Sequence, residues 1–587
     1  MQARVLSTLC ILGLLAADAQ AGEDPGVLLR VDLQPVTGNE LVSQFRVLAD
    51  LGTWAVVLAG PAEMEQLVGL GLVCQILDTD PTAKSYYVVY SRQAGQFQSL
   101  DALGDVLAAD SERALVRMEA PSAELVAGLG FELAKVFMDP IRAVPENRLL
   151  SSNILSVHPE VQEMVDAVNQ ENLDLNVESL VAFGTRNSST AGGVAASQYI
   201  YDQFVSSGIA DVSFQDYGSC AANNVIAVIP GAVFPENIFV LGAHYDSLAL
   251  FTSSAPGADD NASGTAAVLE AARIMKNYSF ENTLVFVAFS CEEFGLFGSH
   301  YYASQARANG DNIIGMINLD MIGYLAAGDA MDVDIIAGRG SSSLRELAFW
   351  ATEQYVPGFT AIVGTGMIGG TSDFASFINN GFPAIWPFED VDRDSPYIHT
   401  ANDTVGLSLN SFTLAVNCTK SAVATLASLA EPVDEIAIGH TPLEDTTNTT
   451  TPYVVLAQVV SIEPLAAGFP VLYYTINGGA YTDLTMSATA NPNEYQAEIP
   501  AQPLNTTIGY YLEAEDTLGN SDTAPVAAPA EVHTFTVAAA SGWALAQAQA
   551  STLDSDEANP GVLVSCLACF LLPSAVGLVW RRRLRRR

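Results

Sequence analysis

Positively charged residues are scarce in this sequence. Its 587 residues include 24 lysines and arginines against 66 aspartates and glutamates, which gives a formal net charge of -42. A surface this acidic repels phosphate, and this excludes a nucleic acid as the partner. Because 49% of the residues are hydrophobic, the chain can still bury large cores, and its length predicts about three or four domains.

Cysteine is also scarce, with seven residues in the chain. Between residues 22 and 560 no two cysteines have the C-x-x-C spacing, which excludes the common thiolate zinc sites there. The four cysteines of that segment allow three disulfide pairings, and the sequence selects none of them. They are Cys74, Cys220, Cys291 and Cys418. No histidine stands beside Cys291, so it is predicted to be a small buried apolar residue and not a nucleophile.

The two ends of the chain predict export. Residues 1–21 have a basic start at Arg4, an apolar stretch and the cleavage pattern Ala19-Gln20-Ala21, as in a signal peptide. Residues 541–560 are typical of a flexible stalk, and residues 561–587 combine an apolar segment long enough to span a membrane with an arginine-rich tail. We expect an extracellular, periplasmic or cell-surface protein whose C-terminal segment is either a membrane anchor or a cleaved sorting signal.

Residues 22–150 contain a weak internal repeat. The segment WAVVLAGPAEMEQLVGLGLVCQIL from Trp54 is similar to RALVRMEAPSAELVAGLGFELAKVF from Arg113. Each reads as strand, short helix with an early proline, glycine turn and strand. This predicts a small α+β domain, either a prodomain or an accessory domain.

Residues 151–430 alternate apolar runs with helical patterns. The runs 224–229, 238–243, 283–289, 315–319, 333–337 and 384–387 are expected to be strands. Buried strands between helices predict a central α/β domain with a mostly parallel sheet. Residues 431–540 change to short alternating strands with an Asn477-Gly478 turn, which predicts an all-β sandwich of the immunoglobulin or fibronectin III kind.

Histidines and carboxylates follow the apolar runs of the central domain. Ligands of α/β sheets bind beyond the carboxyl ends of strands, so these side chains are expected to meet there. They are His244, Asp246, Asp259, Asp260, Glu292, Glu293, Asp320 and His399. Imidazoles and carboxylates suit Zn²⁺, with Co²⁺ or Mn²⁺ as substitutes. Without a cation, carboxylates crowded into one crevice would repel each other. Two zinc ions, three carboxylates and one hydroxide are together neutral.

Glu292 and Glu293 are adjacent at the end of one apolar run. Neighbouring side chains on an extended chain point in opposite directions. Glu293 is therefore expected to bind metal, while Glu292 faces the nucleophilic water as general base.

Six motifs occur in an order that resembles peptidase family M28, the secreted bacterial leucyl-type dizinc aminopeptidases in particular. They are GAHYDS, PGADDNASG, CEEFGLFGS, NLDMIGY, TSDFASFINNGFPA and HTANDT, between about residues 170 and 429. The resemblance implies five metal ligands, namely His244, Asp259, Glu293, Asp320 and His399. It makes Asp259 the bridge between two zinc ions and Glu292 the base, with Asp246 and Asp260 supporting them from outside the ligand set.

The substrate pocket is predicted to be apolar. Its candidate residues are Met321, Met367, Phe374, Phe377 and Ile398. They favour a hydrophobic first residue on the substrate. The loop before Ser372 carries Met367-Ile368-Gly369-Gly370 where family members often have a tyrosine, so the resemblance does not extend to a tyrosine hydroxyl at this place.

The resemblance implies a monomeric aminopeptidase that acts on peptide or protein substrates. The sequence leaves other activities open: a carboxypeptidase or dipeptidase of the same family, a single-zinc glutaminyl cyclase, and a non-enzymatic surface receptor or adhesin. Metal content, peptide cleavage and the role of Glu292 discriminate between these hypotheses.

Overall fold

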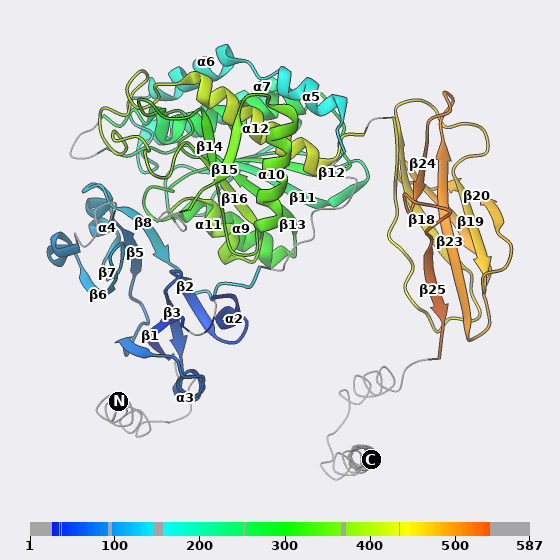
Figure 1. Ribbon diagram of the computed structural model, residues 1–587, viewed down its shortest axis with the longest axis horizontal. Helices are drawn as coiled ribbons and strands as arrows, with labels where there is room; N and C mark the ends of the chain where they lie inside the picture. The colour runs from blue at the N-terminus through cyan, green and yellow to red at the C-terminus, as the bar shows by residue number, and fades with distance from the viewer. Residues whose placement is uncertain are drawn as a thin grey trace, which may run out of the picture. The chain divides into compact units, whose positions relative to one another are not determined.

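The chain forms two compact units in the computed structural model (Figure 1). The structure describes residues 26–539 except 35, 37, 92–96, 145–155, 250–253, 366–370 and 434. The first unit runs to Ala437 and includes Val460–Ile462, and the second comprises the rest from Ile438. The expected signal peptide, stalk and C-terminal segment lie outside the described residues. Within the described part, no helix has the length and apolar character needed to cross a membrane.

The first unit begins with two four-stranded antiparallel sheets. The sheet orders are β2-β3-β1-β4 and β6-β7-β5-β8, so the second sheet repeats the topology of the first, in agreement with the internal repeat. The strands are β1 (Val27–Asp32), β2 (Arg46–Asp50), β3 (Trp54–Ala59), β4 (Cys74–Asp78), β5 (Tyr86–Tyr90), β6 (Asp105–Ala109), β7 (Arg113–Arg117) and β8 (Glu132–Val136). The helices are α2 (Gly38–Val42), α3 (Pro61–Gly69), the 3-10 turn Phe97–Ala102 and α4 (Ala120–Ala127). One apolar cluster joins the facing sides of both sheets, including Leu28 and Val56 from one and Val88 and Leu115 from the other.

The next part of the first unit is built on an eight-stranded sheet of order β15-β14-β16-β13-β11-β12-β10-β9. The strands are β9 (Asp211–Gln215), β10 (Asn224–Ile229), β11 (Phe234–His244), β12 (Asn282–Phe289), β13 (Asn312–Asn318), β14 (Asp332–Ala337), β15 (Thr360–Val363) and β16 (Ala384–Phe388). Strands β11, β12, β13 and β16 are parallel neighbours, whereas β14 runs antiparallel to β16, and β10 runs antiparallel to both β12 and β9. Strand β14 is parallel to β15, so four of the seven neighbouring pairs are parallel and three are antiparallel. The sheet is therefore mixed, with parallel pairs in the majority as predicted.

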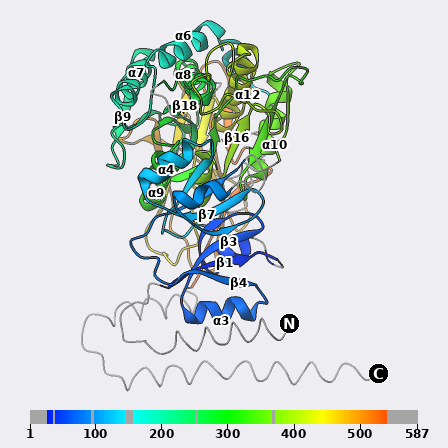
Figure 2. The same cartoon turned by 90° about the vertical axis from the view of Figure 1, so that its left-hand side faces the viewer.

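Helices cover both faces of this sheet. One face packs on α5 (Pro159–Asp166), α6 (Gln170–Val181), α7 (Ala191–Ser207), α8 (Gly264–Met275), α10 (Ser342–Tyr355) and α12 (Phe412–Ala430). The other packs on α9 (Phe297–Asn309) and α11 (Phe374–Asn379). Figure 2 shows α6, α7 and α8 lying close together. Because both faces are covered, every residue of β12 is buried, as expected for a continuous apolar run.

Local signals explain where the helices begin and end. The Thr190 hydroxyl accepts a hydrogen bond from the Gly193 amide at the start of α7. This satisfies an amide that has no partner inside the helix. Gly208 ends α7 with a φ of 96°, a conformation that glycine adopts without steric cost.

The second unit consists of antiparallel sheets. Its sheets have the orders β17-β18-β22-β21 and β20-β19-β23-β24, with β25 also paired to β23. The strands are β17 (Ile436–Gly439), β18 (Tyr453–Ser461), β19 (Val471–Ile476), β20 (Thr482–Thr485), β21 (Ser487–Ala488), β22 (Glu494–Ile499), β23 (Thr506–Glu515), β24 (Ser521–Ala524) and β25 (His533–Val537). The all-β character agrees with the sequence, and the likeness to immunoglobulin or fibronectin III domains stays a prediction.

Candidate metal centre

The candidate site lies at the carboxyl ends of the three central parallel strands. His244 is the last residue of β11, Glu292 and Glu293 follow β12, and Asp320 follows β13. Since β11 lies between β13 and β12 and is parallel to both, these three ends meet at one edge of the sheet. The turn Ala258–Ser263 before α8 contributes Asp260. His399 comes from the loop between β16 and α12.

Asp260 lies between the two imidazoles. Its Oδ1 is 3.2 Å from His244 Nε2, and its Oδ2 is 3.2 Å from His399 Nε2. His244 Nε2 is also 3.2 Å from Asp320 Oδ1, and His399 Nε2 is 2.8 Å from Glu293 Oε2. The cluster therefore has two halves, His244 with Asp320 and His399 with Glu293, and each half receives one oxygen of Asp260.

The expectation that Asp259 occupies this bridging position is wrong. Asp259 Oδ1 accepts a hydrogen bond from the Gly323 amide at 2.9 Å. Burial, and then the neighbouring Glu389 and Asp403, raises the pKa of Asp259 well above its ordinary value. The two aspartates are adjacent in an irregular turn, where no alternation rule states which of them faces the cluster. Asp260, expected outside the ligand set, takes the bridging place.

Asp403 fixes this turn. Its two carboxylate oxygens accept hydrogen bonds from the amides of Asp259 and Asp260, at 2.9 and 3.1 Å. Asp403 belongs to the HTANDT motif, but sequence reasoning assigned it no role. The sequence signal for it is a carboxylate four residues after His399, inside the same motif.

Glu292 lies close to the half formed by His244 and Asp320. One potential ligand atom of each of these three residues lies within 4.8 Å of the corresponding atoms of the other two. Glu292 is buried, with 7% of its surface exposed, and it lines the cavity in front of the cluster. Burial raises the pKa of Glu292 well above its ordinary value, and His244 opposes the rise.

Side chains outside the cluster hold its members in place. Asp246 Oδ1 lies 3.6 Å from His244 Nδ1 and accepts a hydrogen bond from the Glu292 amide at 3.2 Å. The Ser372 hydroxyl donates to Asp320 Oδ2 at 2.5 Å. Asp246 therefore lies beside His244 as expected, and Ser372 is a contact that the sequence did not reveal.

The site also contains a buried arginine that sequence reasoning missed. Arg186 is fully buried, and among the described residues its guanidinium donates to backbone carbonyls alone. The acceptors are the carbonyls of Leu180, Tyr245, Pro256 and Gly257, at 2.6 to 3.2 Å. Burial lowers the pKa of Arg186 to about 10, and the nearby Asp403 and Asp260 oppose this shift. Arg186 thus links Tyr245, just after β11, to Pro256 and Gly257, just before the turn that carries Asp260.

The electrostatics of the cluster reflect the crowding of its carboxylates. Although burial opposes it, Asp320 and Glu292 raise the pKa of His244 well above its ordinary value. His399 is shifted in the same direction against burial, mainly by Glu293. Burial and the proximity of Asp260 raise the pKa of Glu293 to about 8. Cations in this cluster would relieve the part of the Glu293 pKa shift that comes from repulsion by Asp260.

The residues present fit zinc. Tetrahedral zinc with bonds of about 2.0–2.2 Å holds its ligand atoms about 3.3–3.5 Å apart. The distances from the Asp260 oxygens to the two imidazoles are near this value. Glu293 Oε1 is buried and has no hydrogen-bond partner among the described residues, as expected of an atom that faces a metal.

A cavity of about 180 Å³ opens in front of the cluster. Met321 and Ile398 line it, as expected for the substrate pocket, and so do Trp386, Phe388 and Val391. Of the other pocket candidates, Met367 lies outside the described residues. Phe374 and Phe377 are corrected to core residues, since both are buried against the face of the sheet that carries α9 and α11. Tyr90 and Glu132 of the N-terminal sheets and Ser91, just after β5, also line it, as do Thr371, Asp392 and Asp394.

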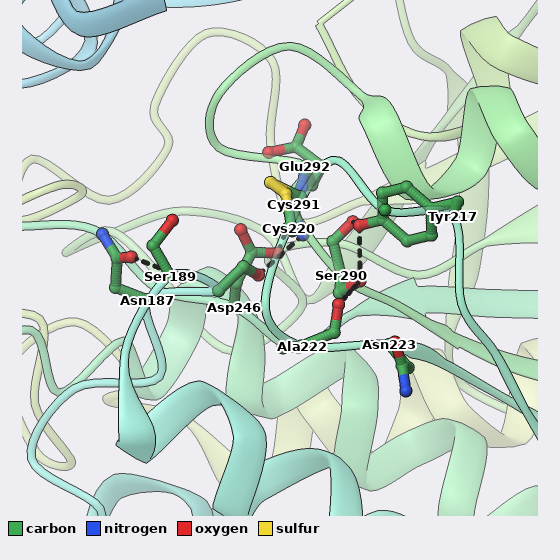
Figure 3. The surroundings of a disulfide bond; sticks show 12 residues. Asn187, Ser189, Tyr217, Cys220, Ala222, Asn223, Asp246, Ser290, Cys291 and Glu292 are labelled. Atoms are coloured by element: carbon green, nitrogen blue, oxygen red, sulfur yellow. Dashed lines mark hydrogen bonds between the residues drawn. A yellow bond between two sulfur atoms is a disulfide. The ribbon is translucent and has the colours of Figure 1, made fainter.

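Cys291 is not a free apolar residue. It forms a disulfide with Cys220, and Glu292 is the next residue in the chain (Figure 3). The sequence could not select this pairing because the two cysteines are 71 positions apart. Cys74 and Cys418 are free thiols.

Histidines and carboxylates buried together beyond the ends of a central sheet are typical of metal-dependent enzymes, a class that includes the metal-dependent hydrolases. Comparison with known proteins narrows the class. Residues 224–418 match the model of peptidase family M28. The chain is 31% identical over 260 residues to a probable leucine aminopeptidase from Arthroderma benhamiae, covering 42% of this chain and 68% of that protein. It is 29% identical over 388 residues to a probable zinc metalloprotease from Leptosphaeria maculans, covering 55% of this chain and 88% of that protein.

The chain belongs to peptidase family M28, and it is a hydrolase of peptide bonds. Among solved structures, it is similar to the LapA aminopeptidase of Legionella pneumophila. That similarity has 21% identity and a TM-score of 0.49, and it covers 60% of this chain and 99% of the other.

Proposed function

We propose that this protein is an aminopeptidase that uses two zinc ions. The observation that carries the proposal is Asp260, which presents one oxygen to each imidazole. His244 and Asp320 would hold one ion, and His399 and Glu293 the other, with Asp260 shared. When bound, such ions polarise a peptide carbonyl and make water acidic enough to lose a proton near neutral pH.

Glu292 performs the proton transfers. Its carboxylate takes a proton from the attacking water and returns it to the nitrogen of the leaving amine. Asp246 fixes the position of this residue, because it accepts from the Glu292 amide while lying beside His244. Ser372 keeps one oxygen of Asp320 occupied, so that the other oxygen faces His244.

The lining of the cavity favours an aminopeptidase over a carboxypeptidase or dipeptidase. Among the described residues that line it, none is lysine or arginine, and Glu132, Asp392 and Asp394 add carboxylates beyond the cluster. A substrate ammonium group is attracted to such surroundings, whereas a terminal carboxylate is repelled. The small volume of about 180 Å³ suits a chain end better than the middle of a peptide.

The apolar part of the lining supports a hydrophobic first residue. Trp386 and Phe388 stand with Met321, Val391 and Ile398 in the same cavity. Burying an apolar side chain there removes it from water, which contributes roughly 1.5–3 kcal/mol to binding. The single-zinc cyclase alternative is disfavoured by the second half of the cluster, and the receptor alternative by the complete set of potential ligands.

A peptide panel with added zinc tests the proposal. Leucyl-p-nitroanilide and a peptide with a free N-terminus and an amidated C-terminus should be cleaved. The same peptide with an acetylated N-terminus should not be cleaved, and a chelator should abolish activity. The panel also includes a peptide with an acetylated N-terminus and a free C-terminal carboxylate. Cleavage of this peptide alone would show that the protein is a carboxypeptidase and not an aminopeptidase. Absence of any cleavage in zinc-loaded protein would contradict the proposal.

We extend the proposal to export of the protein, with peptides or proteins outside the cytoplasm as substrates. It is supported by the signal-peptide pattern in residues 1–21 and by the apolar and arginine-rich pattern in residues 561–587. Edman sequencing of the mature protein should start near Gly22. A start at Met1 in protein isolated from its native source would contradict export by this signal.

A further inference from the structure

The Cys220–Cys291 disulfide braces the segment that carries the proposed general base. Cys291 follows Ser290 at the end of β12 and precedes Glu292 directly, while Cys220 lies in the loop between β9 and β10 (Figure 3). The disulfide therefore links Glu292 to a loop that contributes no residue to the metal cluster.

The backbone at Cys291 needs to be held in its conformation. Its φ is 63°, in the left-handed region that residues with a side chain rarely adopt. Such a conformation costs about 1–3 kcal/mol and persists only where its surroundings impose it. The rotation at Cys291 decides the direction in which the chain leaves the strand, and hence where Glu292 points.

Hydrogen bonds and the disulfide impose this conformation together. The Cys291 amide donates to the Ser188 hydroxyl at 2.8 Å, and the Glu292 amide donates to Asp246 at 3.2 Å. On the side of the Cys220 loop, the Ser290 hydroxyl donates to the Ala222 carbonyl at 3.0 Å. The amides of Cys291 and Glu292 are thus fixed by hydrogen bonds, and the disulfide adds a covalent link to the Cys291 side chain, which is also buried in an apolar cluster.

The positions of the potential metal ligands depend less on the Cys220–Cys291 disulfide. His244, Asp260 and Asp320 lie on other elements, and His399 comes from a separate loop. Glu293, the one ligand candidate on the braced segment, lies 2.8 Å from His399. Reduction of the disulfide should therefore displace Glu292 while most of the potential metal ligands stay in place.

We propose that the Cys220–Cys291 disulfide positions Glu292 for proton transfer. This inference rests on the proposed function. The two cysteines touch no reacting atom, so they are positioning residues. A displacement of the base by about 1 Å is enough to slow a reaction up to about 100-fold.

The test begins with reversible reduction of the full chain. A water-soluble phosphine gives two electrons to the disulfide, water supplies the oxygen of the phosphine oxide, and two thiols form. We expect kcat for leucyl-p-nitroanilide to fall about 10-fold or more, with KM changed less than about 2-fold and zinc per chain unchanged. Reoxidation should restore kcat. Loss of zinc together with kcat would overturn the proposal, because the disulfide would then support the metal centre.

A second experiment distinguishes an effect of reduction on Glu292 from an effect on the structure in general. Reduction in the Glu292→Gln background should leave the residual kcat unchanged, since the displaced group is already disabled. An equal further fall there would overturn the proposal. Cys220→Ala should reproduce the reduced state without reductant, and Cys74→Ser is the matched control, which should respond to reduction as the wild type does.

The outcomes distinguish a failure of the disulfide's positioning role from a failure of the proposed peptidase activity. If Cys220→Ala does not fold, the reduced wild-type protein still gives the answer, because its zinc content and circular dichroism are measured in the same sample. Full kcat in the reduced protein overturns the inference and leaves the proposed function intact. Failure of the oxidised, zinc-loaded protein to cleave any peptide overturns both.

Discussion

Asp259 and Asp260 are neighbours in sequence with opposite surroundings. Asp260 faces both imidazoles, and Asp259 accepts a hydrogen bond from the Gly323 amide. The sequence motif contains both residues, and only their placement in the fold separates the two roles.

This difference gives the first prediction. Asp260→Asn should reduce bound zinc from two to at most one ion per chain and lower kcat/KM at least 100-fold, because one ligand oxygen and its charge are lost. Asp259→Asn is the matched control and should retain both ions. The measurement is zinc by mass spectrometry on dialysed protein. Loss of zinc in Asp259→Asn with retention in Asp260→Asn would contradict the assignment.

The second prediction concerns Glu292. Glu292→Gln should lower kcat about 100- to 10,000-fold, the contribution usual for a general acid or base, while zinc content stays at the wild-type level. Glu124→Gln removes the same charge from an exposed position on α4 and should leave kcat unchanged. A wild-type kcat in Glu292→Gln would show that Glu292 is not the general base.

At the scale of elements, Arg186 ties together the segments around the metal centre. Arg186→Met should lower the free energy of unfolding by about 3–5 kcal/mol, because it leaves buried carbonyls without donors. Arg393→Lys, at a position where 45% of the side chain is exposed, should change it by less than about 0.5 kcal/mol. Chemical denaturation measures both. Equal small effects would show that the Arg186 contacts contribute little.

A further element-scale prediction follows from the contact between β8 and α9. His300 of α9 stacks on Phe137, just after β8, with ring centroids 3.4 Å apart. Burial, with Arg307 and Lys135 contributing, lowers the pKa of His300 to about 4. The unfolded state then binds the proton more readily, so stability falls as the pH decreases from about 6.5 towards 4, by at most about 3 kcal/mol.

His300→Gln should abolish this component. Unfolding free energies measured at pH 7 and pH 4.5 should decrease less in the variant than in the wild type. An identical decrease in both proteins would show that His300 does not titrate within this range.

The elements differ in how far the sequence predicts them. The buried runs of β10, β11, β12 and β14 are visible as apolar stretches, and the structure has strands there. The edge strands β9 and β15 are short and largely exposed, so they leave no apolar run to detect. Strand direction is not encoded in an apolar run either, which is why the antiparallel pairing of β14 with β16 was not foreseen.

The sequence likewise predicts some features of the site and not others. The residue types and their places after strands predict the cluster, because parallel strand ends meet at one edge of a sheet. Asp403, Ser372 and Arg186 were missed because their contacts join segments far apart in the sequence. The same reason applies to the Cys220–Cys291 pairing.

At the scale of the whole molecule, the metal centre belongs to the first unit alone. Both groups of potential metal ligands among the described residues lie there. Zinc at 100 times its dissociation constant should stabilise that unit by about 2.7 kcal/mol. Calorimetry of the full chain should therefore show a transition that moves to lower temperature with a chelator and a second that does not move. A chelator that shifts every transition equally would contradict this assignment.

The most direct test of the central claim is anomalous diffraction at the zinc absorption edge from crystals grown with zinc. We predict two peaks about 3.5–4 Å apart, one beside His244 and Asp320 and the other beside His399 and Glu293, with Asp260 in contact with both. A single peak, or a pair bridged by Asp259, would contradict the account.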